Sequence, residues 1–501
     1  MLREIEAVSV FSDSDEVSSG WLQVLQQEKI PYGCHADLAG RITIFPDKFP
    51  EEVYEYVKKG GIAVLEKPGD LSRIDLKRKG EGVISRFYFP LLGDDGITAP
   101  AVVDIYEGQG WGHFIVHEER LVKYGMKIGY HPLVLEVPWG QGFFYIISCR
   151  LSSLLMYYGD TLRRFSPFTE VTERVTAIDK SKISRVMVAV LKRAFERAGI
   201  PYIGLWYYPQ DYSTVFMFRI DVDGVEGEIT GRISDICEQY GIRTTFYVNM
   251  NLCQPEEDCL KKISRFHFIG NHGNIHNVFD TVYGNKDNIV TCERWLEKLF
   301  GEKTSLFSAP RGLWNEDLAV ALEELGYTSS SDFGFYIDGF PFHPVVRGKP
   351  LKILQIPVHP YCVNRAQRYY KEKGLGKVSP EEVIEYYKKI IDHKEKLNEP
   401  ILIYGHPNGL GYQSHIVLPA IFEYIRQKGI HTTSIPEFSD WWIRRENTKL
   451  QVFYDPDEDV YKIDVSDDVS LMIETKEPVK VGIKSRSITV KDRQIITGVM
   501  V

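Results

Sequence analysis

Paired cysteines, long apolar runs and surplus positive charge are all scarce in this 501-residue chain. The seven cysteines are scattered and include no C-x-x-C pair, which argues against a disulfide framework. Pairing of Cys253 with Cys259 stays open, but reduced thiols and a cytoplasmic location are favoured. The first residues lack the apolar core of a signal peptide, and no run approaches ~20 apolar residues, so we expect no membrane partner.

The charge balance also limits the partners of the chain. Lys and Arg number 60 against 69 Asp and Glu, which gives a formal net charge of −9. Because nucleic-acid binding needs a basic face, no nucleic-acid partner is expected. The chain is 44% hydrophobic and 26% charged, as globular proteins are, and its length predicts roughly three domains of ~150 residues.

The first part of the chain, residues 1–175, alternates short apolar runs with helical patterns. This rhythm predicts a flavodoxin-like, doubly wound sheet with helices on both faces. The phrases PEEVYEYVKKGGIAVL and VPWGQGFFYI resemble glutamine-amidotransferase-like domains. An active domain of that kind needs a cysteine on a glycine-flanked elbow, and neither Cys34 nor Cys149 has that setting. We therefore expect a non-catalytic domain, which is also the candidate surface for oligomer formation.

The rest of the chain divides into three further segments. Residues 176–204 carry apolar side chains at helical spacing and predict a connector helix that ends at Gly199. Residues 205–445 hold seven or eight strand–helix units, which fit a closed or nearly closed (β/α) barrel. Residues 446–501 alternate in the manner of short strands with Asp and Lys turns, and predict a small antiparallel β domain.

The most informative stretch is FRIDVDG, residues 218–224. A run of apolar and aromatic residues from Val215 to Ile220 predicts a strand buried on both faces, and it ends in Asp221 and Asp223. In parallel sheets and barrels, chemistry is found where the strands end. We expect the two acids to point in different directions, so that they need not share one role. The alternative is a pair of capping residues for the next helix.

A second stretch, IGNHGNIHN, contains His272 and His276. On a helical turn, two side chains four residues apart project from one face and can chelate one divalent metal. Two histidines and one carboxylate leave positions open for water, which suits catalytic Zn²⁺. Two surface histidines are the alternative. His406 ends a later strand, ILIYGHP, at the same edge of the barrel.

Five motifs, FRIDVDG, GIRTTFYVN, IGNHGNIH, APRG and YGHP, occur in this order. Over residues 205–440 the chain thereby resembles the polysaccharide deacetylase superfamily, the NodB-homology domain. The resemblance implies a distorted (β/α) barrel of NodB type and a metal-dependent hydrolase that removes N-acetyl groups from carbohydrates. It makes Asp221 the general base and His406 the general acid. It implies that the metal ligands are Asp223, His272 and His276.

Three positions depart from the family pattern. Ser308 stands where the family has an arginine that orients the base, and Arg311 is our candidate for that role from a shifted position. The two acids of FRIDVDG are separated by one residue, as in a subset of the family. Gly273 replaces the usual Ser or Thr after the first histidine.

Two more strand-end residues, Asp332 and His359, are candidates for substrate binding, with packing as the alternative. Two other functions also stay open. The cytoplasmic expectation favours hydrolysis of a small non-sugar amide, because polymeric sugars are mostly outside the cell. The serine at position 308 favours a carbohydrate-binding relative that has lost activity.

Overall fold

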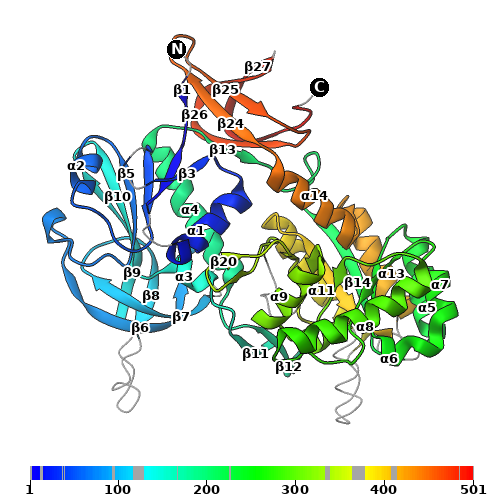
Figure 1. Ribbon diagram of the computed structural model, residues 1–501. Helices are drawn as coiled ribbons and strands as arrows, with labels where there is room; N and C mark the ends of the chain where they lie inside the picture. The colour runs from blue at the N-terminus through cyan, green and yellow to red at the C-terminus, as the bar shows by residue number, and fades with distance from the viewer. Residues whose placement is uncertain are drawn as a thin grey trace. The chain divides into compact units, whose positions relative to one another are not determined.

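The computed structural model describes residues 3–11, 15–35, 38, 40–92, 96–116, 129–165, 168–224, 227–332, 339–363, 379–407, 414–484 and 486–499 (Figure 1). The chain forms two compact units. The first contains Met1–Tyr157, Ala177–Asp211 and Arg444–Val501, and the second contains Tyr158–Thr176 and Tyr212–Ile443.

The second unit is built on one parallel sheet with strand order β21-β18-β17-β16-β15-β14-β22, and β23 also pairs with β14. Its strands are β14 (Val215–Val222), β15 (Thr245–Val248), β16 (Phe268–Asn271), β17 (Leu306–Phe307), β18 (Ser329–Ser330), β21 (Leu354–Gln355), β22 (Ile401–Gly405) and β23 (His431–Thr432). Its larger helices are α5 (Gly227–Gln239), α7 (Glu257–Ile263), α8 (Val282–Phe300), α9 (Glu316–Leu325), α11 (Pro380–Lys396) and α13 (Ser414–Gln427), and α14 (Ile435–Asn447) follows them.

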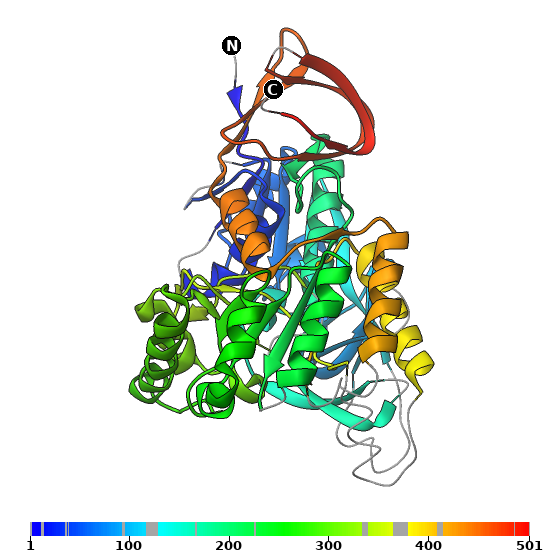
Figure 2. The same cartoon turned by 90° about the vertical axis from the view of Figure 1, so that its right-hand side faces the viewer.

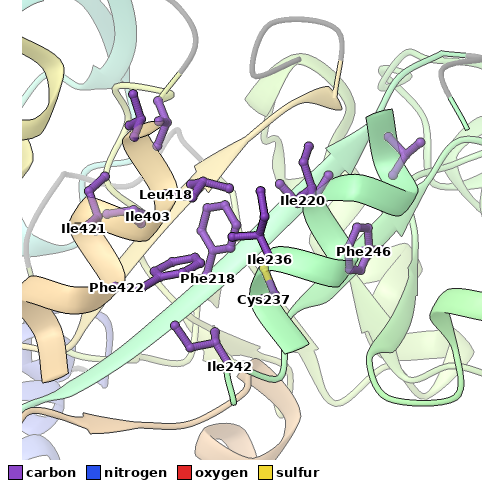
Figure 3. Packing of buried hydrophobic residues seen from close by; sticks show 14 of the residues in the cluster. Phe218, Ile220, Ile236, Cys237, Ile242, Phe246, Ile403, Leu418, Ile421 and Phe422 are labelled. Carbon is purple, nitrogen blue, oxygen red and sulfur yellow. The ribbon is translucent and has the colours of Figure 1, made fainter. Parts of the chain in front are cut away.

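Strand β14 is buried along its whole length, as its apolar run predicts. Its side chains pack between α5 and α13 (Figure 3). The labelled members of this core are Phe218, Ile220, Ile236, Cys237, Ile242, Phe246, Ile403, Leu418, Ile421 and Phe422. Burying one such large apolar side chain contributes about 1.5–3 kcal/mol, so the core fixes the strand whose end carries both acids.

The parallel sheet curls, and the segment 356–363 after β21 connects its two edges. The Ile356 N–H donates to the carbonyl of Ser330 (2.9 Å), and the His359 N–H donates to that of Leu402 in β22 (2.9 Å). This curled parallel sheet agrees with the barrel-like fold that the sequence predicts for this part of the chain.

The first unit contains a nine-stranded sheet of order β3-β2-β4-β5-β10-β9-β8-β6-β7. Its strands are β2 (Val8–Val10), β3 (Tyr32–Cys34), β4 (Ile42–Phe45), β5 (Ile62–Glu66), β6 (Arg78–Tyr88), β7 (Ile97–Tyr106), β8 (Trp111–Val116), β9 (Gly129–Trp139) and β10 (Gly142–Ile147). The helices of this part are α1 (Asp15–Glu28), α2 (Val53–Lys58) and α3 (Leu151–Leu155). Along this order, the strands β3, β2, β4, β5 and β10 pair in parallel, and the strands β10, β9, β8, β6 and β7 pair antiparallel. The doubly wound parallel sheet predicted from the alternation of strands and helices therefore accounts only for the parallel part.

The C-terminal strands do not form a sheet by themselves. The second sheet of this unit has the order β1-β24-β25-β26-β13, with β27 on β26, and its long strands curve strongly (Figure 2, orange to red). Its members are β1 (Arg3–Glu4), β13 (Tyr202–Leu205), β24 (Leu450–Asp455), β25 (Val460–Val465), β26 (Leu471–Ile483) and β27 (Arg486–Ile496). Strands β1 and β13 cover backbone edges that would otherwise stay unpaired. Strands β25 and β26 pair in parallel, so the sheet is mixed and not purely antiparallel.

Three smaller expectations can be compared with the structure. Helix α4 (Lys180–Ala198) forms where the connector helix is predicted, and Gly199 ends it with φ 66°. No cysteine of the described residues takes part in a disulfide bond, Cys253 and Cys259 included. Within the described ranges, no helix combines the length and apolarity needed to cross a membrane.

Candidate metal centre and active site

The two acids at the end of β14 have different surroundings. Asp221 is 1% exposed, and its Oδ2 accepts a hydrogen bond from Arg219 Nη2 at 3.0 Å. Asp223 lies one residue beyond the strand and faces three imidazoles instead. Two residues that are two apart on a regular strand share one face, so strand alternation does not account for this separation. Asp223 lies beyond the end of β14, where the strand pattern no longer fixes the direction of its side chain.

Asp223, His272 and His276 form a cluster that could hold a metal ion. Nε2 of each imidazole lies 3.2 Å from Asp223 Oδ1, and one ligand atom from each residue lies within 4.8 Å of the other two. Asp223 Oδ1 and His276 Nε2 are buried and have no hydrogen-bond partner among the described residues. Two buried lone-pair atoms that converge without a donor are the environment that a divalent cation requires. The residues present therefore fit a metal.

The orientation of His272 is fixed from behind. Its Nδ1 donates to the carbonyl of Ser308 at 2.7 Å, which leaves the Nε2 lone pair directed at Asp223. A backbone acceptor on the far nitrogen is the usual device that holds a metal-binding imidazole in the right tautomer.

The loop between the two histidines is not a helical turn, so that part of our expectation is wrong. It consists of bends, and Gly273 adopts φ 78°, where a Cβ would lie 2.7 Å from Asn288 Nδ2. Asn271 Oδ1 accepts from the Gly273 N–H (2.7 Å), and Asn249 Nδ2 donates to the Gly273 carbonyl (2.9 Å). The glycine is thus required by this loop, and buried amides bring the two imidazoles together.

His406 approaches the same carboxylate from β22. Its Nε2 lies 3.3 Å from Asp223 Oδ2, and its Nδ1 lies 3.3 Å from the sulfur of Cys362. Cys362 is 2% exposed and belongs to the segment that connects the sheet edges. Cys362 was not among the site residues predicted from the sequence. Its position in PVHPYCVNR, shortly after an apolar strand run, could have indicated a place at the end of the sheet.

The imidazoles and the carboxylate of this cluster shift each other's pKa values. Burial acts to raise the pKa of Asp223, but the nearby imidazoles of His272, His276 and His406 outweigh it and bring that pKa well below its usual range. Burial acts to lower the pKa of His272, yet Asp223 raises it overall. For His406, burial is likewise outweighed by Cys362 and Asp223, so its pKa lies well above the usual range. Protons and a divalent cation would therefore compete for the same groups.

The structure places Arg219, and not Arg311, beside Asp221. Arg311 has an exposed side chain and φ 58° in the 3₁₀ turn η4 (Pro310–Gly312). No contact between Arg311 and Asp221 occurs within the described part of the chain. Arg219 is fully buried on β14 and supplies the cation that the sequence analysis sought elsewhere.

Asp332 and His359 both lie in the interior. Asp332 accepts hydrogen bonds from Ser330 Oγ (2.7 Å) and Gln355 Nε2 (3.1 Å), and burial raises its pKa. His359 Nε2 pairs with the Tyr386 hydroxyl at 2.9 Å, and burial lowers its pKa to about 3. These internal contacts favour structural roles, so substrate binding by either residue stays a prediction.

Comparison with known proteins supports the resemblance that the five motifs carry. Residues 218–330 match the family model described as polysaccharide deacetylase. This segment runs from β14 to β18 and includes both acids, His272, His276 and Ser308, but not His406. The N-terminal amidotransferase resemblance stays a prediction.

Individual relatives are distant. An uncharacterized 30.6 kDa protein in the fumA 3′ region of Geobacillus stearothermophilus is 23% identical over 125 residues, which are 24% of this chain and 47% of the relative. The chain thus spans about half the length of that relative. Among solved structures, Puue allantoinase matches with 16% identity and a TM-score of 0.39, over 48% of this chain and 93% of the other. A chitin deacetylase from Colletotrichum lindemuthianum matches with 14% identity and a TM-score of 0.33, over 46% and 88%.

Proposed function

We propose that this chain is a metal-dependent hydrolase that removes N-acetyl groups from a carbohydrate. The observation that carries the proposal is the convergence of Asp221, Asp223, His272, His276 and His406 at one end of a curled parallel sheet. The polysaccharide deacetylase model, which matches four of these five residues, supports the substrate class.

Asp223, His272 and His276 would hold the cation, and two imidazoles with one carboxylate favour Zn²⁺. When bound, such an ion lowers the pKa of water and polarises an amide carbonyl. Three protein ligands leave coordination positions open, as hydrolysis requires.

Asp221 is proposed as the general base. Its Oδ2 is occupied by Arg219, whereas its Oδ1 is buried with no hydrogen-bond partner among the described residues. Oδ1 is therefore the oxygen available to accept the proton of the attacking water. A positioned carboxylate of this kind typically accelerates proton transfer by 10²–10⁴-fold.

His406 is proposed as the general acid. Its Nδ1 is paired with Cys362, so Nε2 is the nitrogen that faces the site. An amine leaves poorly as an anion, so the departing sugar nitrogen must receive a proton as its bond to the acyl carbon breaks. Nε2 is placed to donate it.

The test is acetate release from N-acetylglucosamine oligomers by the purified chain and by Asp221→Asn. We expect the variant to lose about 10²–10⁴-fold in kcat because the base is removed. Asp235→Asn, on the exposed surface of α5 where Asp235 pairs with Lys262, is the matched control and should stay active.

The substrate panel should also include small linear and cyclic amides. Turnover of those amides alone would move the assignment to a non-sugar hydrolase. Sugar binding without any turnover, in protein that contains stoichiometric metal, would reject the enzyme and leave a binding protein.

A further inference from the structure

We infer that Arg219 is the positioning residue for Asp221, a role that rests on the proposed function of this site. The pair lies on one strand, two residues apart, so both side chains project from the same face of β14. Nothing in the polysaccharide deacetylase match or in the five motifs assigns Arg219 a role. Its assignment comes from its contacts.

The guanidinium of Arg219 is held at both ends. Nη2 donates to Asp221 Oδ2 at 3.0 Å, and Nη1 donates to the carbonyl of Ser331, directly after β18. The planar fork of arginine allows these two donors to act at once, which the single ammonium of lysine does not reproduce.

Two aromatic rings confine the same guanidinium. Its central carbon lies 5.4 Å from the ring centroid of Tyr247 on β15 and 5.3 Å from that of Tyr404 on β22. These strands flank β14 on either side. Arginine faces on aromatic rings are attractive contacts, and desolvation strengthens them. The guanidinium is thus held between rings from the two strands on either side of β14.

Burial explains why Asp221 needs this partner. Arg219 is 0% exposed and Asp221 is 1% exposed, and a carboxylate at that depth needs a polar partner. Because the guanidinium takes Oδ2 only, it presents Oδ1 in one direction. A base must be placed within a fraction of an ångström to work, and a misplacement of 1 Å can cost about 10²-fold in rate.

The role of Ser308 follows from the same geometry. Its backbone carbonyl orients His272, while its hydroxyl is buried without a hydrogen-bond partner among the described residues. Ser308, the residue before APRG, therefore contributes to the metal side of the site, and the base is oriented from its own strand.

The experiment compares Arg219→Met and Arg219→Lys with the wild-type chain, with kcat, KM and bound metal measured for each. We expect Arg219→Met to lose about 10²-fold in kcat while KM and metal content stay near wild type. Arg219→Lys should recover part of the loss, because the charge returns without the fork. A purely structural role would instead lower stability and leave the kcat of the folded fraction unchanged.

Arg243→Met is the matched control. Arg243 also makes a carboxylate contact (Glu437, 2.7 Å), a carbonyl contact (Phe266, 3.2 Å) and a ring contact (Phe268, 4.2 Å), but at the opposite end of the neighbouring strand. It should retain wild-type kcat.

The double variant Arg219→Met/Asp221→Asn removes both charges and so covers the case in which Arg219→Met alone does not fold. If Arg219 acts through Asp221, the double variant should have the same residual kcat as Asp221→Asn. A further 10-fold fall, or an Arg219→Met variant within about 3-fold of wild-type kcat, overturns the inference. If the wild type is active and either of these results is found, only the positioning role of Arg219 is rejected and the proposed function stands. A metal-loaded wild type that hydrolyses no amide rejects the proposed function, and this inference with it.

Discussion

Both units contain parallel strands that end in polar residues, but the described residues at two of these ends differ in whether their polar atoms have hydrogen-bond partners. In the second unit, Asp221 Oδ1 and Asp223 Oδ1 are buried without hydrogen-bond partners among the described residues. In the first unit, β5 ends in Glu66, whose carboxylate accepts from both the backbone N–H and the hydroxyl of Ser152. Cys149, beyond β10, is fully buried, and burial, with a smaller contribution from Glu66, raises the pKa of its thiol.

The difference shows what separates a site from a well-packed strand end. Internal donors satisfy the carboxylate of Glu66, and a thiol with a raised pKa is a poor nucleophile. The acids of the second unit retain acceptor atoms without a hydrogen-bond partner among the described residues. Glu66 and Cys149 thus lack the features of a catalytic pair, and the non-catalytic role of the N-terminal part stays a prediction.

The largest effect should come from removing the metal ligands. The double variant His272→Ala/His276→Ala is expected to carry no stoichiometric metal and to lose more than about 10³-fold in activity, because two of three ligands are gone. Metal content by mass spectrometry and acetate release measure this. His393→Ala, at an exposed position of α11, is the control. A variant that still binds one ion per chain would contradict the ligand assignment.

A smaller effect is expected when the partner of His406 is removed. Cys362→Ala should lower kcat about 10-fold with little change in KM, because the imidazole loses the group that orients its Nδ1. Cys237→Ala removes a buried sulfur from the core of the same unit and controls for packing loss. Equal losses in the two variants would show that the sulfur at position 362 only fills space.

The smallest effect concerns Glu66, at the end of β5 in the first unit. Burial raises the pKa of Glu66 to about 7, from an ordinary value of 4.5. The folded state then binds this proton more readily than the unfolded state, so stability falls as the pH rises from 5 to 8. The expected loss is about 2 kcal/mol over that range. Urea unfolding should show this slope in the wild-type chain and lose it in Glu66→Gln. Parallel slopes would mean that Glu66 is ionised in the folded chain.

Local sequence signals predicted much of the second unit. Asn315 and Gly326 bound α9, and Ser379 opens α11 with a capping box, in agreement with the capping preferences of these residue types. The apolar run of β14 and the two acids at its end were also readable from the chain, because an apolar run is a local property.

Long-range contacts could not be predicted in the same way. Cys362 and His406 are 44 residues apart and meet because the segment 356–363 lies against β22. Arg219 lies inside an apolar run. Nothing local in the sequence indicates that this arginine is buried beside Asp221, because its contacts come from other strands of the sheet. The expected contact of Arg311 with the base was inferred from its place in the APRG motif. The direction of its side chain depends on the backbone, which has φ 58° at this residue, and the motif does not reveal that angle.

The sheet that joins the two ends of the chain also sets an order of assembly. Strand β1 pairs with β24, with Arg3 opposite Tyr454, and β13 pairs with β26, with Tyr202 opposite Glu474. Both early strands leave the ribosome long before their partners exist. The main sheet of the second unit uses only strands between Val215 and Thr432 and can pair earlier. During synthesis the nine-stranded sheet and the main sheet of the second unit can therefore form first, while the mixed sheet of the first unit has to wait for β24 to β27.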